Sequence, residues 1–141
     1  MSFLVSADYS LVIKTRNLQL LLDELEPSAQ ADAEEVAMSV MDGYFRKRNI
    51  DCANVWNKTG VDRNKSVILM LLHLTVYMLH NGVDPDAIPK TRTDNNEMAM
   101  KWLKDVASGE VETSLPILEG DSNVPKNVSR FGSLPKFNSD Y

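Results

Sequence analysis

The most apolar stretch of the chain runs from Val67 to Leu79, where hydrophobic side chains fall on nearly every side of a helix. It covers about 13 positions, fewer than the ~20 apolar residues that span a bilayer. A helix that is apolar all round is buried in a globular core, so we expect this one to be the central helix. Asp62 is a good N-cap for its start, and Asn81 with Gly82 offers the left-handed turn that closes a helix.

Residues 28–48 show the apolar period of a second, amphipathic helix. Its hydrophobic residues recur at four-residue spacing, so they are expected on one buried face. They are Val36, Ala37, Val40, Met41, Tyr44 and Phe45. Gly43 costs about 1 kcal/mol relative to alanine inside a helix. We therefore expect Gly43 to allow the close approach of another backbone.

A third helix is predicted before Gly109, which is expected to end it. Asp94 and Glu97 can cap its start, and an earlier start near Pro89 is the alternative, because proline favours a first helical turn. The residues of its apolar stripe are Met98, Ala99, Trp102, Leu103, Val106 and Ala107.

The N-terminal residues 1–27 carry weaker signals. Leu18 to Leu25 predicts a short helix, whereas Phe3 to Ser10 fits either a short strand or a capped turn. The chain has no basic start and only three consecutive apolar residues before Ser6, which does not match a secretory signal.

After Gly109 the pattern changes, because prolines and glycines interrupt every apolar run and no periodicity continues. The chain is therefore expected to be all-α, a small bundle of about four helices with an extended C-terminal tail. We divide it into an N-terminal segment with a short helix (1–27), a helical core (28–112) and the tail (113–141).

The tail carries side chains that a simple linker does not need. Three aromatic residues stand near its end, in a segment too short to bury them by itself. From residue 121 to residue 139 it holds one acidic residue against Lys126, Arg130 and Lys136. A basic, aromatic segment on an acidic protein is suited to docking on the acidic surface of a partner. The expected docking residues are Arg130, Phe131, Gly132, Lys136, Phe137 and Tyr141.

The net charge is −5, which does not give the broad positive field that non-specific DNA binding requires. A DNA-binding helical domain remains an alternative. Its positive patch would comprise Arg46, Lys47, Arg48, Lys58, Arg63 and Lys65. The single cysteine, Cys52, excludes an intrachain disulfide.

Candidate chemistry is sparse. His73 and His80 are seven residues apart, too far for the three- or four-residue spacing of a shared metal on one helix. Cys52 has no histidine nearby in sequence, so a buried, unreactive thiol is the simpler interpretation. No phosphate-binding glycine loop, nucleophile elbow or zinc-binding motif is present. We therefore expect no enzyme activity, no metal and no cofactor.

Trp56 lies between two predicted helices, in a segment expected to be a loop (51–60). Such an aromatic either pins the loop to the core or meets a neighbouring subunit, and pinning is favoured. Trp56 and Arg63 are kept as candidates for a subunit interface.

Five sequence elements follow one another in an order that resembles a known group of proteins. They are Asp42-Gly43-Tyr44-Phe45-x-x-Arg48, Asn54-Val55-Trp56-x-x-Thr59-Gly60, Asp62-Arg63-Asn64, Leu74-Thr75-Val76-Tyr77-x-Leu79-His80 and Met98-Ala99-x-Lys101-Trp102-Leu103-x-x-Val106-x-x-Gly109. This ordered set is similar to the head-to-tail connector (adaptor or head-completion) proteins of tailed bacteriophages, including those of Mu-like prophages. The resemblance covers roughly residues 28–112, and the tail motif Arg130-Phe131-Gly132-Ser133-x-x-Lys136 extends it.

The resemblance implies a structural neck protein of the virion. Protomers would assemble in the host cytoplasm into a ring, twelvefold in such connectors, beneath the portal at the head–tail junction. The C-terminal tail would dock on the portal, other neck or tail proteins would lie below, and packaged DNA would pass through without specific binding. No membrane is involved. The alternative is a cytosolic helical interaction module or regulator whose tail binds a different protein.

Overall fold

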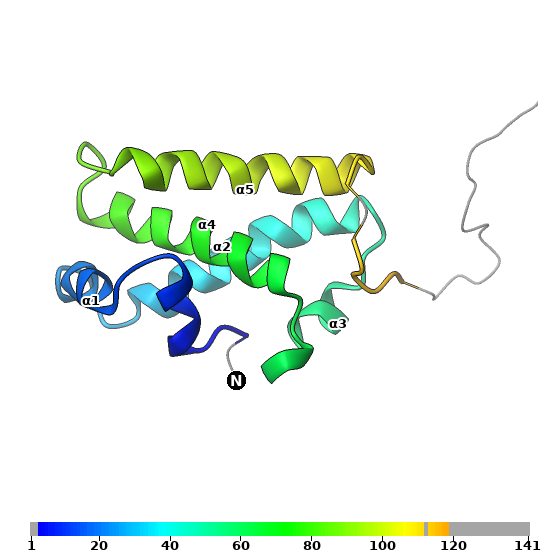
Figure 1. Cartoon of the computed structure of the whole chain (residues 1–141), viewed down its shortest axis with the longest axis horizontal. Coiled ribbons are helices and arrows are strands. Elements are labelled where there is room, and N and C mark those ends of the chain that lie inside the picture. The colour runs from blue at the N-terminus through cyan, green and yellow to red at the C-terminus, as the bar shows by residue number, and fades with distance from the viewer. Residues whose placement is uncertain (1–2, 112, 119–141) are drawn as a thin grey trace, which may run out of the picture.

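The computed structural model describes residues 3–111 and 113–118, and in this part of the chain the fold is all-α (Figure 1). Four α-helices of nine residues or more carry the fold, as the sequence predicts. The elements are the 3₁₀-helix η1 (Ser6–Leu11), α1 (Thr15–Asp23), α2 (Ala29–Arg46), α3 (Cys52–Trp56), the 3₁₀-turn η2 (Gly60–Asp62), α4 (Lys65–Val83) and α5 (Lys90–Ser108). The tail beyond residue 118 lies outside the described residues.

The bundle is organised around α4, which packs against α2, α5, α1 and η1 (Figure 1). Its side chains are buried on nearly every face, which confirms the prediction of a central helix. At 19 residues α4 is also long and apolar enough to cross a membrane by length and composition alone. The core helix of a globular protein has the same properties, and half of the apolar window is buried in the bundle.

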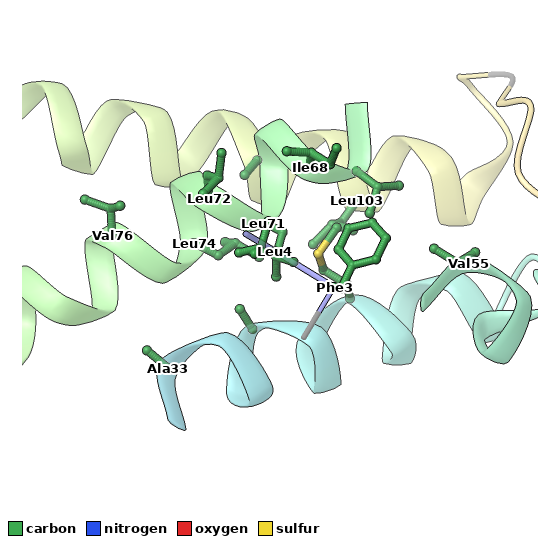
Figure 2. Close-up of a cluster of buried hydrophobic side chains, with 14 of the residues drawn as sticks. Phe3, Leu4, Ala33, Val55, Ile68, Leu71, Leu72, Leu74, Val76 and Leu103 are labelled. Carbon is green, nitrogen blue, oxygen red and sulfur yellow. The ribbon is translucent and has the colours of Figure 1, made fainter. Parts of the chain in front are cut away.

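A single hydrophobic core joins the N-terminal segment to the helices. Phe3 and Leu4 lie in the same cluster as Leu71 and Leu74 of α4 (Figure 2). The cluster also takes in Leu115, from the start of the predicted tail. The core therefore contains side chains from both sides of the predicted boundaries at residues 28 and 113.

Only part of the predicted apolar face of α2 is buried. Ala37, Met41 and Phe45 are fully buried, because a four-residue repeat keeps them on the line that faces α4 and α5. Val36 and Val40 are 53% and 37% exposed. Each valine stands one residue before a buried residue, and one residue corresponds to a rotation of about 100° around the helix. The two valines therefore lie on the outer side of α2.

Two predicted ends of α4 were wrong. Asn64, and not Asp62, caps the start, because its side chain accepts a hydrogen bond from the Val67 N–H. The helix continues through Gly82 to Val83, and Gly82 does not adopt the left-handed conformation. A Cβ at Gly82 would lie 3.3 Å from Leu25 Cδ2. The glycine therefore allows α4 to pack closely against Leu25, which follows α1.

Of the remaining predictions about helices and loops, some are correct and one is wrong. The earlier start of α5 is correct, since Pro89 is its N-cap, and Gly109 ends the helix at φ 86°. The N-terminal residues form a capped turn, in which the Val5 N–H donates to Asp8. The segment expected to be a loop contains the short helix α3, which Asp51 caps.

The expectation for Gly43 was also wrong. Outside its own helix, no atom lies within 4 Å of the position that a Cβ would occupy. Gly43 thus carries the entropic cost of glycine without a packing benefit.

Replacing Gly43 with alanine should raise the free energy of unfolding by about 0.5–1 kcal/mol, because alanine restricts the unfolded chain and fits the exposed helix. Urea unfolding followed by circular dichroism measures the change. Gly109→Ala is the control and should destabilise, because its φ is 86° and a Cβ would lie 2.8 Å from Arg48 Nη1. If Gly43→Ala lowered the free energy of unfolding, this would contradict the open space that the structure shows beside Gly43.

Candidate functional site

The predicted tail starts from a fixed point at one end of the bundle. Ile117 forms an antiparallel bridge with Ile50, just after α2. The Asp51 N–H donates to the Pro116 carbonyl at 2.8 Å, and the Leu118 N–H donates to the Asn49 carbonyl at 2.8 Å. Residues 113–118, which were predicted to belong to the tail, are thus held against the helices.

Side chains reinforce this anchor. Leu115 is buried in the core, whereas Ile117 and Leu118 are 46% and 53% exposed. Two open grooves flank the segment, one of about 300 Å³ beside Asn54 and Lys58 and one of about 350 Å³ beside Arg48. Residues 115–118 therefore lie in a partly apolar surface with space on both sides.

Trp56 pins α3 to the bundle. Its indole Nε1–H donates to Asp42 Oδ1 of α2 at 2.6 Å. Its ring meets Phe3 edge-on with centroids 5.0 Å apart and lies 6.2 Å from Phe45. These contacts agree with the pinning that the sequence favours, and the predicted interface role of Trp56 stays a prediction.

Arg63 fastens the N-terminal segment to the bundle. Its guanidinium donates to both carboxylate oxygens of Asp8, at 2.5 and 3.2 Å, and to the Phe3 carbonyl at 3.0 Å. Burial raises the pKa of Asp8, but hydrogen bonds from Arg63 and from the Val5 N–H outweigh burial and leave this pKa below its usual value. The carboxylate is therefore charged at neutral pH.

The structure brings the two predicted interface residues together around Phe3. Trp56 meets one edge of the ring, and the Arg63 guanidinium carbon lies 5.8 Å from its centroid. Sequence reasoning missed Phe3, Asp8 and Asp42 because each acts through a contact distant in sequence. The predicted docking residues of the tail all lie outside the described residues. They are Arg130, Phe131, Gly132, Lys136, Phe137 and Tyr141.

The Arg63–Asp8 contact should be important for stability. Asp8→Ala leaves a mostly buried guanidinium without its carboxylate, so it should lower the free energy of unfolding by about 2–3 kcal/mol. Chemical denaturation measures the loss. Arg46→Ala is the matched control, since the Arg46–Asp42 pair is 4.0 Å long and the Arg46 side chain is 71% exposed. The control should change the stability by less than about 0.5 kcal/mol, and equal losses would contradict the role given to Arg63.

Candidate catalytic and metal-binding groups do not gather into a site in the described part of the chain. No group of three or more His, Cys, Asp or Glu residues could hold a metal ion among residues 3–111 and 113–118. Burial, and then the Asp42 carboxylate, raise the pKa of Cys52 to about 11. The thiol is therefore protonated at neutral pH and a poor nucleophile.

His73 and His80 lie on α4 and face Arg92 of α5. Burial, and then the charge of Arg92, lower the pKa of both imidazoles. Arg92 is itself held by a 2.6 Å hydrogen bond to the Val12 carbonyl. The buried Nε2 of His80 has no hydrogen-bond partner in the described chain. Both imidazoles are therefore expected to be neutral at pH 7 and to act as packing side chains.

Stability should fall as the pH is lowered from 8 to 5. The histidines of the unfolded chain bind protons near pH 6.5, while those of the folded chain bind them at lower pH. The contribution of the two histidines to stability is thus complete above pH ~6.5 and is lost progressively as the pH falls from there toward their lower folded-state pKa values. Unfolding midpoints across this range measure the effect. His73→Gln should flatten the pH dependence, whereas an unchanged slope in a double His73→Gln, His80→Gln variant would contradict it.

Comparison of the chain with models of protein families, with curated proteins and with solved structures finds no match.

Proposed function

We propose that this chain is a structural neck protein of a tailed bacteriophage. It forms an oligomeric ring, twelvefold by analogy with connector proteins, that joins the portal of the DNA-filled head to the tail. The C-terminal tail docks on the portal protein, and other neck or tail proteins bind below. The ordered sequence elements between residues 42 and 109 motivate the proposal, and the fixed exit of the tail is the observation that carries it.

The exit of the tail supports a docking role. The bridge between Ile50 and Ile117 and the burial of Leu115 fix where the chain leaves the helices. A segment that starts from a fixed point loses less freedom when its end binds a partner. The aromatic rings of Phe131 and Phe137 would fill pockets of the portal, while Arg130 and Lys136 would pair with acidic residues at the rim.

The turn beside Arg63 supports a contact between protomers. Arg63 Nε donates to the Gly60 carbonyl at 2.9 Å and so holds η2 in place. Val61, at the centre of this turn, is 91% exposed. A large apolar side chain presented on a fixed turn suits an interface with the next copy in the ring. Trp56 is linked to this turn indirectly, because it packs on Phe3, whose carbonyl accepts a hydrogen bond from Arg63.

The charge of the chain supports passage of DNA without binding. A net charge of −5 per protomer would give an assembled ring a strongly negative charge. An acidic channel repels the phosphate backbone, so the duplex would slide through and not adhere.

Deleting residues 121–141 should leave a folded helical domain and abolish attachment to portal-containing capsids. The folded core keeps all of its described contacts, whereas the docking residues are removed. Circular dichroism checks the fold, and co-sedimentation with capsids measures attachment. In the full chain, Phe131→Ser with Phe137→Ser should weaken attachment at least about tenfold, as loss of anchor residues does.

Asn127→Ala with Ser129→Ala is the matched control, since it changes two tail residues without removing an aromatic or a charge. It should attach like the unaltered chain. Full attachment of the deleted chain would remove the tail from the mechanism. Absence of rings in electron micrographs of capsid-bound chain, or of any binding to capsids, would favour a cytosolic interaction module instead.

A further inference from the structure

On the outer face of α2 lies an apolar surface that no other described residue covers. Val36 and Val40 are 53% and 37% exposed, and they lie one turn apart with Ser39 beside them. Gly43 continues the line and is open to solvent. We call Val36, Ser39, Val40 and Gly43 the outer stripe of α2.

Charge is distributed unevenly around this stripe. Exposed acidic side chains stand before α2 and in its first turns, and exposed basic side chains follow the end of the stripe. The acids are Asp23, Glu24, Glu26, Asp32 and Glu35, and the bases are Arg46, Lys47 and Arg48. This order complements the dipole of α2, and it also presents a negative-to-positive gradient to anything that lies along the stripe.

The chain after Leu118 carries the opposite order of charge. Glu119 and Asp121 come first, and Lys126, Arg130 and Lys136 follow. Phe131 and Phe137 stand among these basic residues. A segment that ran back along α2 would place its acids beside Arg46 to Arg48, its bases beside the acidic half, and its aromatic rings over the valines.

The exit point gives this segment a suitable reach. Leu118 is hydrogen-bonded to Asn49, and Val36 lies thirteen residues before Asn49, about 20 Å away at the rise of a helix. Phe131 lies thirteen residues after Leu118. A flexible chain of that length has a root-mean-square end-to-end distance of about 20 Å. The local concentration of a tethered group is highest when these two lengths agree.

We propose that residues 119–137 dock on the outer stripe of α2 of the same chain. Phe131 covers Val36 and Val40, and Arg130 pairs with the acids of the first half of α2. The segment thus has a binding surface on its own bundle, separate from any surface on another protein. This docking does not depend on the proposed neck function, because it requires only the isolated chain.

Disulfide trapping in the full chain tests the proposal. In a Cys52→Ser background, Ser39→Cys is combined with Ser133→Cys, so that one thiol lies on the stripe and one beside Phe131. In the matched control, Lys104→Cys replaces Ser39→Cys. Lys104 is exposed on α5, five residues before Gly109, and Gly109 lies beside Arg48, which lines the same groove as Ile117. A tail that only diffuses near its exit would therefore meet Cys at 104 as readily as Cys at 39.

Under mild oxidation at low protein concentration, the 39–133 disulfide should form within monomers at least about tenfold faster than the 104–133 disulfide. The rate should not depend on protein concentration. Asp32→Lys with Glu35→Lys, or Phe131→Ser, should remove most of this preference, and 1 M salt should reduce it by screening the charges.

Equal rates at positions 39 and 104 would overturn the proposal. Disulfides that form only between two copies, at a rate that rises with concentration, would also overturn it and would assign the stripe to the tail of a second molecule.

Discussion

The fold depends on the burial of α4 on nearly every side. This helix has apolar side chains around its whole circumference, so no single neighbour can shield it from water. Helices α2 and α5 cover two sides of α4, and α1 together with η1 covers a third side. The short elements at the N-terminus are therefore part of the core, with Phe3 and Leu4 packed beside Leu71 and Leu74 (Figure 2).

Besides the helices around α4, the first and last described residues are held by hydrogen bonds to residues far away in sequence. Arg63 holds Asp8 and the Phe3 carbonyl, which keeps the first residues against the bundle. At the other end, the bridge between Ile50 and Ile117 fixes the point where residue 118 leaves. The proposed docking of the tail, on a portal or on α2, starts from this fixed point.

Sequence periodicity predicted the elements that repeat a pattern over several turns. The central position of α4 follows from spacing alone. For α2, spacing predicted a buried face but did not separate the buried line of Ala37, Met41 and Phe45 from the exposed valines beside it. The exact ends of α4 did not follow, because Asp62 and Asn64 are equally good caps and only tertiary packing decides between them. Single contacts such as Trp56–Asp42 and Arg63–Asp8 have no periodic signal, so sequence reasoning could not find them. The predicted docking residues beyond residue 118 rest on composition and resemblance.

Of the proposed properties, the ring that the chain forms against the portal is the most decisive for its function. Cryo-electron microscopy of portal-containing capsids assembled with the full-length chain tests it most directly. We expect a symmetric ring of helical protomers beneath the portal, with α4 at the centre of each protomer and the segment after Leu118 in contact with portal density. Capsids whose neck density holds no such helical bundle would contradict it.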